Sequence, residues 1–268
     1  MISIVMPSLN QGAFIEQAMQ SVLHQSYAPV ELIVMDGGST DGTPGLLAEY
    51  RDRLAYTVSA PDAGPAAALI EGFRRARGDI FAVLNADDYY LPGALEAVAR
   101  AFVSDPSVDV ISGHGYFTDR SGTPGVPTFS DRWHLRRFSH GACVLVQPST
   151  LFRAEAYERA GGFRDSGRVC WDMELWAALA GTGARFGTLD AFLSAFRLHD
   201  ASITGRAGLR RRRRDHARAV MAELKRRPER PIDRVMHVLY RTTKFCTHPV
   251  RTLRQRAFIH SVLKRWSL

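Results

Sequence analysis

The chain has 268 residues, 46% of them hydrophobic, which is enough to bury a sizeable core and excludes a disordered chain. Its apolar runs all fall short of the roughly 18 residues that span a bilayer, and its first residues lack the basic segment of a secretory signal. We therefore expect a cytoplasmic protein without a transmembrane helix. The three cysteines are odd in number and far apart, so they predict neither a disulfide framework nor a zinc site.

The net charge of +8 is concentrated in the last quarter of the chain. Residues 206–268 carry 19 Lys and Arg against 4 Asp and Glu, whereas residues 1–205 have a net charge of −7. This distribution is typical of a folded domain with a basic appendage, and not of a uniformly basic nucleic-acid-binding protein. We predict a domain of residues 1–205 followed by a basic helical extension of residues 206–268.

Strands and helices are predicted to alternate over the first hundred residues. Short apolar runs predict strands at residues 2–6, 30–35, 55–58 and 80–84. Apolar residues at helical spacing predict helices at residues 14–23, around 46–50, at 65–76 and at 92–102. This alternation with short connections predicts an α/β fold, with a mostly parallel central sheet covered by helices on both faces.

The pattern is looser beyond residue 107. Further strands are predicted at residues 108–112, 142–147 and 192–198, and helices near residues 154–160 and 172–180. The run Asp119-Arg120-Ser121-Gly122 predicts a hairpin turn, and the Gly- and Pro-rich residues 121–137 predict a loop that faces an acceptor. The basic extension predicts two or three helices, divided by prolines at residues 228–231 and at residue 249.

Polar side chains directly follow the predicted strand at residues 80–84. Asn85, Asp87 and Asp88 stand within four positions of its end. Ligands bind at the carboxyl ends of strands in open α/β sheets, and oxygen ligands there suit Mg²⁺ or Mn²⁺ with a phosphorylated substrate. The plainer alternative is that Asp88 starts the next helix, which accounts for one carboxylate but not for Asp87 or Asn85.

An ordered set of motifs resembles the family 2 glycosyltransferases of the GT-A fold. The resemblance covers residues 1–205 and lies in Val5-Met6-Pro7-Ser8-Leu9-Asn10, in Val34-Met35-Asp36-Gly37-Gly38-Ser39-Thr40-Asp41-Gly42-Thr43 and in Leu84-Asn85-Ala86-Asp87-Asp88. It continues through Ala60-Pro61-Asp62-Ala63-Gly64, Gln147-Pro148-Ser149, Trp171-Asp172-Met173-Glu174-Leu175-Trp176 and Phe196-Arg197-Leu198-His199.

The resemblance implies a role for individual residues. The residues implied to bind the donor nucleotide are Pro7, Ser8, Asn10, Asp36, Asp62, Asn85 and Ala86. Asp87 would bind a divalent metal, with His199 approaching the metal or the diphosphate, and Asp172 would be the general base. The residues in supporting positions are Asp88, Gln147, Glu174 and Arg197.

The implied reaction is transfer of a sugar from a nucleotide diphosphate to a hydroxyl of a glycan or lipid-linked acceptor, in glycan or polysaccharide assembly. Mn²⁺ or Mg²⁺ would neutralise the diphosphate leaving group, and Asp172 would remove the proton of the hydroxyl. A single base opposite the leaving group implies inversion. Asp36 suits a pyrimidine N–H, so a UDP-sugar is the first choice of donor, with GDP and dTDP donors as alternatives.

Several alternatives stay open. Asp172 also fits a helix cap, His199 a surface histidine and Asp36 a turn residue. A sugar nucleotidyltransferase would need a Gly-rich loop with Arg and Lys after the first strand, which residues 7–12 lack. A non-catalytic sugar-nucleotide-binding or scaffold protein, recruited by its tail, is the alternative to an enzyme. The extension itself could pack on the domain or on a second subunit, or contact anionic lipid at the inner face of a membrane. It has no recognisable nucleic-acid-binding module.

Overall fold

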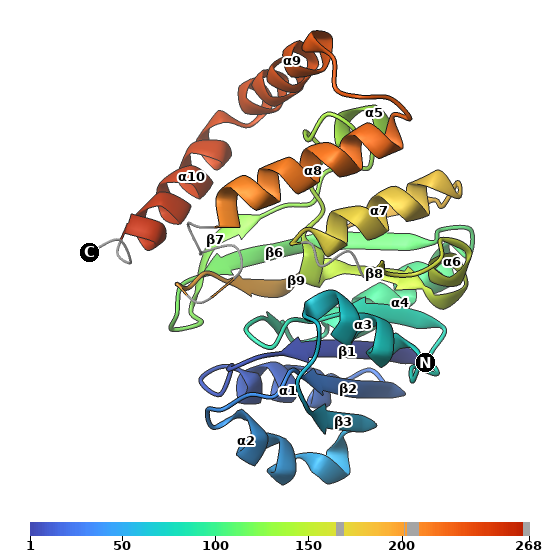
Figure 1. Ribbon diagram of the computed structural model, residues 1–268, viewed down its shortest axis with the longest axis vertical. Helices are drawn as coiled ribbons and strands as arrows, with labels where there is room; N and C mark the ends of the chain where they lie inside the picture. Colours follow the sequence, from blue (N-terminus) through green and yellow to red (C-terminus); the bar gives the residue numbers. More distant parts are fainter. Residues whose placement is uncertain (165–168, 201, 203–208, 265–268) are drawn as a thin grey trace.

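The computed structural model describes residues 1–164, 169–200, 202 and 209–264, which fold as a single curled sheet with helices on both faces (Figure 1). The sheet order is β3-β2-β1-β4-β8-β6-β9-β5, with β7 paired to β6. Its parallel ladders join β1 to β2, β1 to β4, β2 to β3 and β6 to β9, and they carry most of the paired positions. The predicted α/β class with a mostly parallel sheet is confirmed.

The first half of the sheet holds the four predicted N-terminal strands, β1 (Ile2–Ser8), β2 (Val30–Asp36), β3 (Tyr56–Ser59) and β4 (Ile80–Val83). All seven residues of β1 are buried, because helices cover both faces of this central strand. This explains why its sequence is an apolar run with no alternation. Parallel pairing brings the carboxyl ends of β1 and β4 to the same edge.

The second half of the sheet is mixed. It consists of β5 (Tyr89–Tyr90), β6 (Val110–Thr118), β7 (Pro124–Thr128), β8 (Thr150–Arg153) and β9 (Phe186–Arg197). β8 runs antiparallel to both β4 and β6, so it joins the two halves. The predicted hairpin turn at residues 119–122 is confirmed, since it connects the antiparallel strands β6 and β7.

The predicted strand at residues 142–147 is wrong. Residues 142–146 are irregular, a 3-10 helix (η2, Gln147–Ser149) follows, and the strand begins only at Thr150. The backbone N–H groups of Val144 and Val146 donate to the side chains of Asp131 and Ser130 rather than to a neighbouring strand. The predicted loop at residues 121–137 is in part ordered too, as β7 and the start of a short helix, α5 (Leu135–Phe138).

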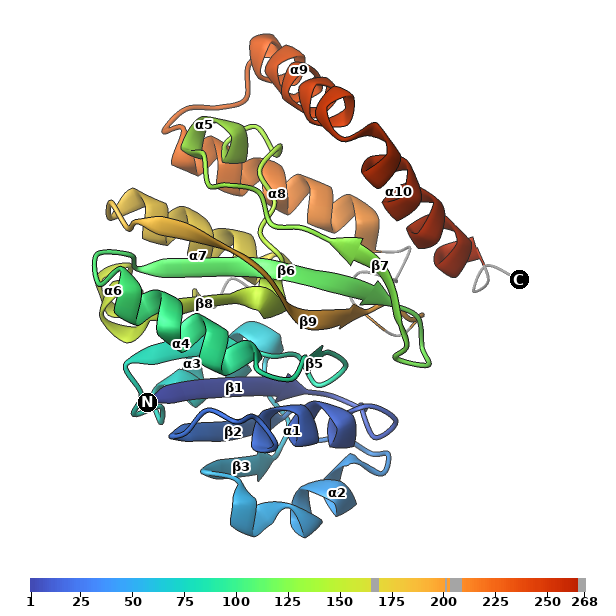
Figure 2. The ribbon, with the colours of Figure 1, turned by 180° about the vertical axis from the view of Figure 1, so that it is seen from behind.

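Two layers of helices bury the two faces of the sheet (Figure 2). On one face lie α1 (Ile15–Leu23), α2 (Thr43–Glu49) and α4 (Ala94–Ser104). On the other lie α3 (Pro65–Phe73), α6 (Ala154–Arg159) and α7 (Trp171–Gly181). A short 3-10 helix, η1 (Arg51–Arg53), leads from α2 into β3.

The basic extension forms three helices, α8 (Arg210–Leu224), α9 (Pro231–Thr247) and α10 (Pro249–Lys264), so the predicted breaks are confirmed. α8 packs on α7 and buries His216 and Val220, whereas α9 and α10 form an arm along the outer edge, with α10 against β7 (Figure 1). Residues 206–208 and 265–268 of the predicted extension lie outside the described residues. None of the helices within the described ranges is long and apolar enough to cross a membrane.

The packing of α3 on β1 gives a stability prediction. A Cβ at Gly72 would lie well inside van der Waals contact with Val5 Cγ1, so Gly72→Ala should lower the free energy of unfolding by about 1–3 kcal/mol. Gly45 of α2 has no heavy atom within 4 Å of the same position, so Gly45→Ala should raise that free energy by up to about 1 kcal/mol. Urea unfolding of both variants measures the difference, and equal midpoints would contradict the close packing.

Candidate active site

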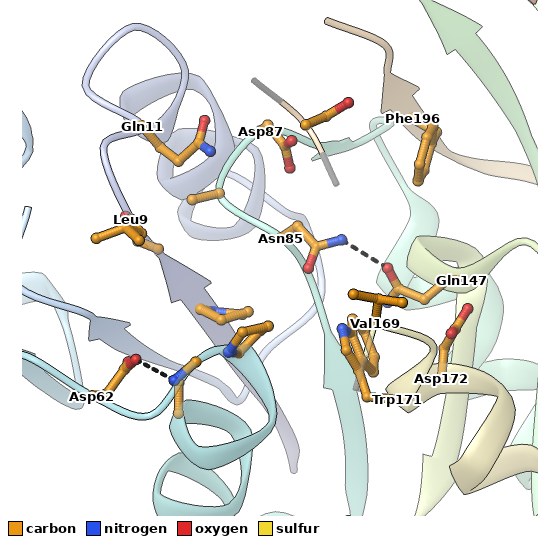
Figure 3. Close-up of a pocket in the computed structure, with 17 residues that line it drawn as sticks. Leu9, Gln11, Asp62, Asn85, Asp87, Gln147, Val169, Trp171, Asp172 and Phe196 are labelled. Carbon is orange, nitrogen blue, oxygen red and sulfur yellow. Dashed lines mark hydrogen bonds between the residues drawn. The ribbon is translucent and has the colours of Figure 1, made fainter. Parts of the chain in front are cut away.

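A pocket of about 310 Å³ opens at the carboxyl ends of β1 and β4, the edge at which the sequence predicts ligand binding (Figure 3). Its walls come from both halves of the sheet, with the loop after β4 on one side and the start of α7 on the other. The predicted residues that line it are Pro7, Ser8, Asp62, Asn85, Ala86, Asp87, Gln147 and Asp172. The fold thus gathers eight predicted residues from five separate segments around one cavity.

The pocket also includes residues that sequence reasoning missed, namely Leu9, Gln11, Gly64, Pro65, Ala68, Val169, Trp171, Phe196 and Ser202. Three of them lie within two positions of predicted residues, so those predicted residues could have pointed to them. They are Leu9, Gln11 and Gly64. Trp171 and Phe196 supply aromatic surface near Asp172 (Figure 3). Trp171 and Trp176 are both buried in the same core cluster, and Trp171 alone of the two also lines the pocket, a difference that the sequence does not reveal.

Asp87 and His199 meet although 112 positions separate them. His199 Nε2 lies 2.9 Å from Asp87 Oδ2, and His199 is completely buried. Two ligands bound at about 2.1 Å to one cation, at a right angle, lie about 3 Å apart, so this spacing fits a shared divalent cation. The described residues contain no cluster of three or more metal-ligating side chains. A cation here would take its other ligands from substrate phosphates and water, as Mg²⁺ sites commonly do.

Asp88 does not face the pocket but holds the loop after β4 in place. It is 1% exposed, and its Oδ1 accepts the backbone N–H of Arg197 at 2.8 Å. The Arg197 guanidinium donates to the carbonyl oxygens of Asp87 and Arg120, each at 2.8 Å, and to the side chain of Gln17. Burial raises the pKa of Asp88 well above its usual range, and the nearby Asp87 carboxylate raises it further. Asp88 and Arg197, two of the residues predicted in supporting positions, therefore hold the backbone of Asp87 in place.

Asn85 is oriented by two acceptors. Its amide nitrogen donates to Gln147 Oε1 at 3.0 Å (Figure 3). It also donates to Asp88 Oδ2 at 3.2 Å. Gln147 is fixed in turn, because its own amide nitrogen donates to Val83 O at 2.9 Å. With both amide hydrogens engaged, the Asn85 carbonyl oxygen is the group left to accept a hydroxyl from a ligand in the pocket.

Two buried polar atoms on the pocket wall have no hydrogen-bond partner among the described residues. They are Ser8 Oγ, at the end of β1, and Gln11 Oε1, in the turn that follows. Buried polar groups are almost always paired in folded proteins, so unpaired ones on a cavity wall indicate that a ligand supplies the partner. Ser8 is one of the residues predicted to contact the nucleotide.

Asp172 stands in the first turn of α7, on the wall opposite Asp87 (Figure 3). Cys170 is the residue at the helix N-cap position, and no side chain caps this helix, so Asp172 is not the cap considered as an alternative. Burial raises the pKa of Asp172, and a hydrogen bond from the Met173 backbone partly offsets the effect. A carboxylate with a raised pKa is a better proton acceptor than an ordinary aspartate.

Besides Asp88, Arg197 and His199, three more predicted residues are not among those that line the cavity. Asp36 is 1% exposed, and its oxygens accept the N–H and hydroxyl of Ser39 and the hydroxyl of Ser59. Asn10 Oδ1 accepts the N–H of Thr40, which ties the two loops after β1 and β2 together. Contact of these two residues with a nucleotide stays a prediction.

Glu174, the third of these residues, is turned toward the extension. It lies 3.0 Å from His216 Nε2 of α8, and the Cys170 N–H donates to His216 Nδ1 at 3.2 Å. One buried imidazole therefore contacts residues two positions before and two positions after Asp172. α8 fixes the start of the helix that carries Asp172, although the sequence alone marks α8 only as part of a basic tail.

Comparisons with known proteins agree with this geometry. Residues 3–160 match the family model described as Glycosyl transferase family 2. An uncharacterised glycosyltransferase of Rickettsia typhi is 27% identical over 220 residues, which are 77% of this chain and 67% of the relative.

Two solved structures share the fold. S. aureus TarS 1–349 in complex with UDP-GlcNAc superposes with a TM-score of 0.67 at 17% identity, over 90% of this chain and 70% of that chain. The mannosyltransferase PcManGT from Pyrobaculum calidifontis, in complex with GDP-Man and Mn²⁺, has a TM-score of 0.64 at 22% identity, over 96% and 74% of the two chains.

The curled, mostly parallel sheet, with its pocket at the carboxyl ends of β1 and β4, is that of a GT-A glycosyltransferase. Because the family model covers more than half of its residues, the chain belongs to glycosyl transferase family 2. The family resemblance seen in the sequence is confirmed.

The contacts of Arg197 give a second stability prediction. Arg197→Ala removes three hydrogen bonds and leaves the Asp88 carboxylate buried without a counter-charge, so the free energy of unfolding should fall by about 3 kcal/mol or more. The control is Arg120→Ala, whose side chain is 61% exposed and also lies over the Phe14 ring, with an expected change within about 0.5 kcal/mol. Thermal unfolding compares the two, and similar losses would show that Arg197 does not hold the site together.

Proposed function

We propose that this glycosyltransferase moves a sugar, with inversion, from a nucleotide diphosphate donor to a hydroxyl of a glycan or lipid-linked acceptor. The observation that carries the proposal is the placement of Asp87 and Asp172 on opposite walls of one pocket (Figure 3). Inverting transfer needs one group at the leaving phosphate and one proton acceptor on the far side of the reacting carbon. The pocket offers one carboxylate for each task.

The donor would lie along the β1 and β4 side of the pocket. Three polar groups on that side could form hydrogen bonds with the donor. They are Ser8 Oγ, Gln11 Oε1 and the Asn85 carbonyl oxygen. Asp62 lies on the same side and already accepts the Gly64 N–H at 2.7 Å (Figure 3). A UDP-sugar is the first candidate and a GDP-sugar the second, and TarS and PcManGT, of the same fold, are complexes with one donor of each kind.

Asp87 and His199 would hold Mn²⁺ or Mg²⁺ together with the diphosphate. Such an ion supplies Lewis-acid neutralisation of the charge that grows on the leaving group. The chain's own part is to keep the two ligands close, through the Arg197 contacts to the Asp87 backbone and the burial of His199. The pocket lining within the described residues contains no Lys or Arg, so a cation is the natural source of positive charge there.

The described lining also differs from the site of a sugar nucleotidyltransferase, for which basic residues near the phosphates are expected. Asp172 would accept the proton of the attacking hydroxyl. Trp171 and Phe196 would form the apolar surface against which an acceptor sugar lies. Since the pocket offers a single base on that side, no covalent sugar intermediate is needed. Action at the cytoplasmic side of a membrane, in polysaccharide or cell-envelope glycan assembly, is part of the proposal.

Asp172→Asn tests the base directly. The variant should still bind the donor but lose transfer by about 10²- to 10⁴-fold, because an amide accepts no proton from the hydroxyl. The assay measures nucleotide diphosphate release from a panel of UDP- and GDP-sugars with glycan acceptors. Glu174→Gln, two positions away and turned toward His216, is the control and should retain most of the activity. Transfer by Asp172→Asn at the parental rate would remove Asp172 from the mechanism.

The raised pKa of Asp172 gives two further readouts. Transfer should decline as the pH falls through a pKa above that of an ordinary aspartate, because only the ionised carboxylate accepts a proton. A buried acid with a raised pKa costs stability when ionised, and that cost disappears as the pH falls through the raised value. Asp172→Asn should therefore unfold at the same or a higher temperature than the parent at pH 7. A lower unfolding temperature would contradict the burial argument.

A further inference from the structure

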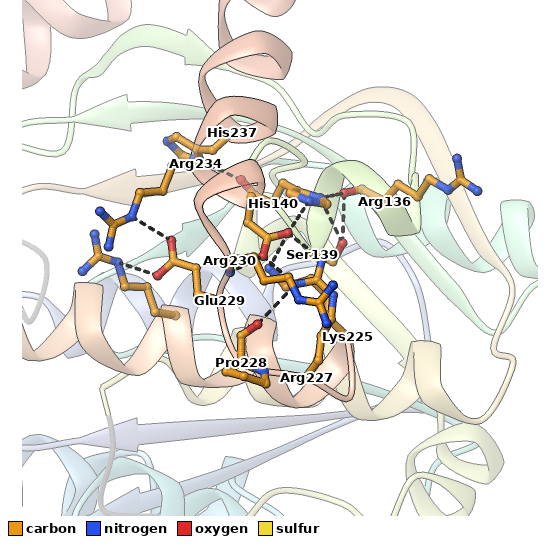
Figure 4. Close-up of polar contacts among 12 residues, drawn as sticks. Arg136, Ser139, His140, Lys225, Arg227, Pro228, Glu229, Arg230, Arg234 and His237 are labelled. Carbon is orange, nitrogen blue, oxygen red and sulfur yellow. Dashed lines mark hydrogen bonds and ion pairs between the residues drawn. The ribbon is translucent and has the colours of Figure 1, made fainter.

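The helices α9 and α10 form an arm, and α9 is attached to the rest of the protein by its polar side (Figure 4). Asp233 of α9 is 4% exposed and accepts two hydrogen bonds from the Arg227 guanidinium, at 2.7 and 2.9 Å, with Lys225 Nζ at 3.3 Å. His140 Nε2 lies 3.1 Å from the same carboxylate. The hydrogen bonds from Arg227, with the Arg230 N–H and Lys225, hold the pKa of Asp233 well below its usual range, so the group stays ionised and paired.

Two further polar contacts fix the rotation of α9 about its axis. His237 Nδ1 lies 2.6 Å from the carbonyl oxygen of His140, and Lys244 pairs with Asp131. Asp233, His237 and Lys244 follow one another at intervals of four and seven residues, so they lie on one side of the helix. α9 is thus held by several polar contacts from end to end and presents its opposite side outward.

The outward side of α9 is apolar, the reverse of an ordinary surface helix. Its large hydrophobic residues are Ile232 (54% exposed), Val235 (58%), Val238 (62%) and Leu239 (56%). Their spacing of three and four residues places them in one stripe. Surface helices normally bury the apolar stripe and expose the polar one, so this arrangement indicates that something other than this chain covers the stripe.

α10 also packs one side on the protein, but that side includes apolar residues. Phe258 and Val262 face the protein, and Gln255 donates to Pro127 O of β7 at 2.7 Å. On the other side Val250 is 61% exposed and Leu253 is 54% exposed. We call these two residues, together with Ile232, Val235, Val238 and Leu239, the outer apolar face.

The outer apolar face is bordered by positive charge. The exposed basic residues beside it are Arg234, Arg241, Arg254 and Arg256. The only acidic residue of α9 and α10 in the described part of the chain is Asp233, which is buried and paired on the inward side. The surface therefore offers apolar side chains flanked by arginine. The exposed Glu229, just before α9, pairs with Arg234 at 3.6 Å (Figure 4), and the remaining positive charge beside the face comes from Arg241, Arg254 and Arg256.

We propose that the outer apolar face docks on a lipid bilayer that carries anionic headgroups. Apolar side chains of an interfacial helix enter the boundary between headgroups and acyl chains, while flanking arginines reach lipid phosphates. Each basic residue adds attraction to an anionic surface. This binding is independent of the proposed donor chemistry, because none of these residues lines the catalytic pocket.

A second copy of the chain fits this face less well. Two-fold pairing of identical surfaces would bring the bordering arginines of one copy close to those of the other, with no exposed acidic residue on α9 or α10 among the described residues to neutralise them. An anionic bilayer has the opposite charge and an apolar interior, so it complements both features at once.

The experiment is flotation of the full chain with phosphatidylcholine vesicles, with and without phosphatidylglycerol, in low salt and in 0.5 M NaCl. We expect binding only to the anionic vesicles, weakened by salt. Val235→Ser/Leu239→Ser should weaken it about tenfold or more, and Arg254→Gln/Arg256→Gln about 10- to 30-fold. Val103→Ser, 78% exposed on α4, and Arg51→Gln/Arg53→Gln on η1 are matched controls that should bind like the parent.

The altered residues of the arm are all exposed, so the variants should fold, and donor hydrolysis at the catalytic pocket should be unchanged. The proposal is overturned if the parent does not bind anionic vesicles in low salt, or if the α9 variant binds them as the parent does. It is also overturned if sedimentation shows a dimer that Val235→Ser/Leu239→Ser dissociates, because a second copy would then be the partner of this face.

Discussion

The active site depends on one buried contact, between Asp88 at the end of the β4 loop and Arg197 at the end of β9. Asp88 accepts the Arg197 N–H, and the Arg197 guanidinium donates back to the Asp87 carbonyl oxygen. This exchange fixes the backbone on which Asp87 stands and the strand that leads to His199. Without it the proposed metal ligands would belong to two unconnected loops. Buried polar groups such as these stabilise a fold when hydrogen bonds satisfy both partners.

Much of the donor side could be predicted, because the order of parallel strands follows from sequence pattern. Ser8 ends the buried strand β1, and Asn85 and Asp87 lie in the loop that follows β4. Neighbouring parallel strands bring their carboxyl ends together. The hydrogen-bond pairing of the polar side chains could not be predicted from the sequence. Asp36 satisfies its carboxylate with Ser39 and Ser59 instead of turning to the cavity, and that choice depends on side-chain distances.

The second half of the chain was less predictable for physical reasons. β8 begins at Thr150 rather than at residue 142, because the N–H groups of the preceding segment donate to side chains and not to a neighbouring strand. The side chains of Ser130 and Asp131 accept these hydrogen bonds. Composition marked residues 206–268 as a basic extension, yet α8 packs on the helix of Asp172 while α9 and α10 lie on the outside. Hydrophobic spacing reveals an apolar stripe, but only the contacts of Asp233 and Lys244 show that it faces outward.

The central claim is that Asp87 and the catalytic pocket bind a nucleotide diphosphate through a divalent cation. Calorimetric titration with UDP, GDP and dTDP, each with Mn²⁺ and with a chelator, tests it on the parent, on Asp87→Ala and on the exposed control Asp52→Ala. We expect that one nucleotide binds the parent and the control only with Mn²⁺, and that Asp87→Ala loses this binding. Equal binding with the chelator, or undiminished binding by a folded Asp87→Ala variant, would contradict it.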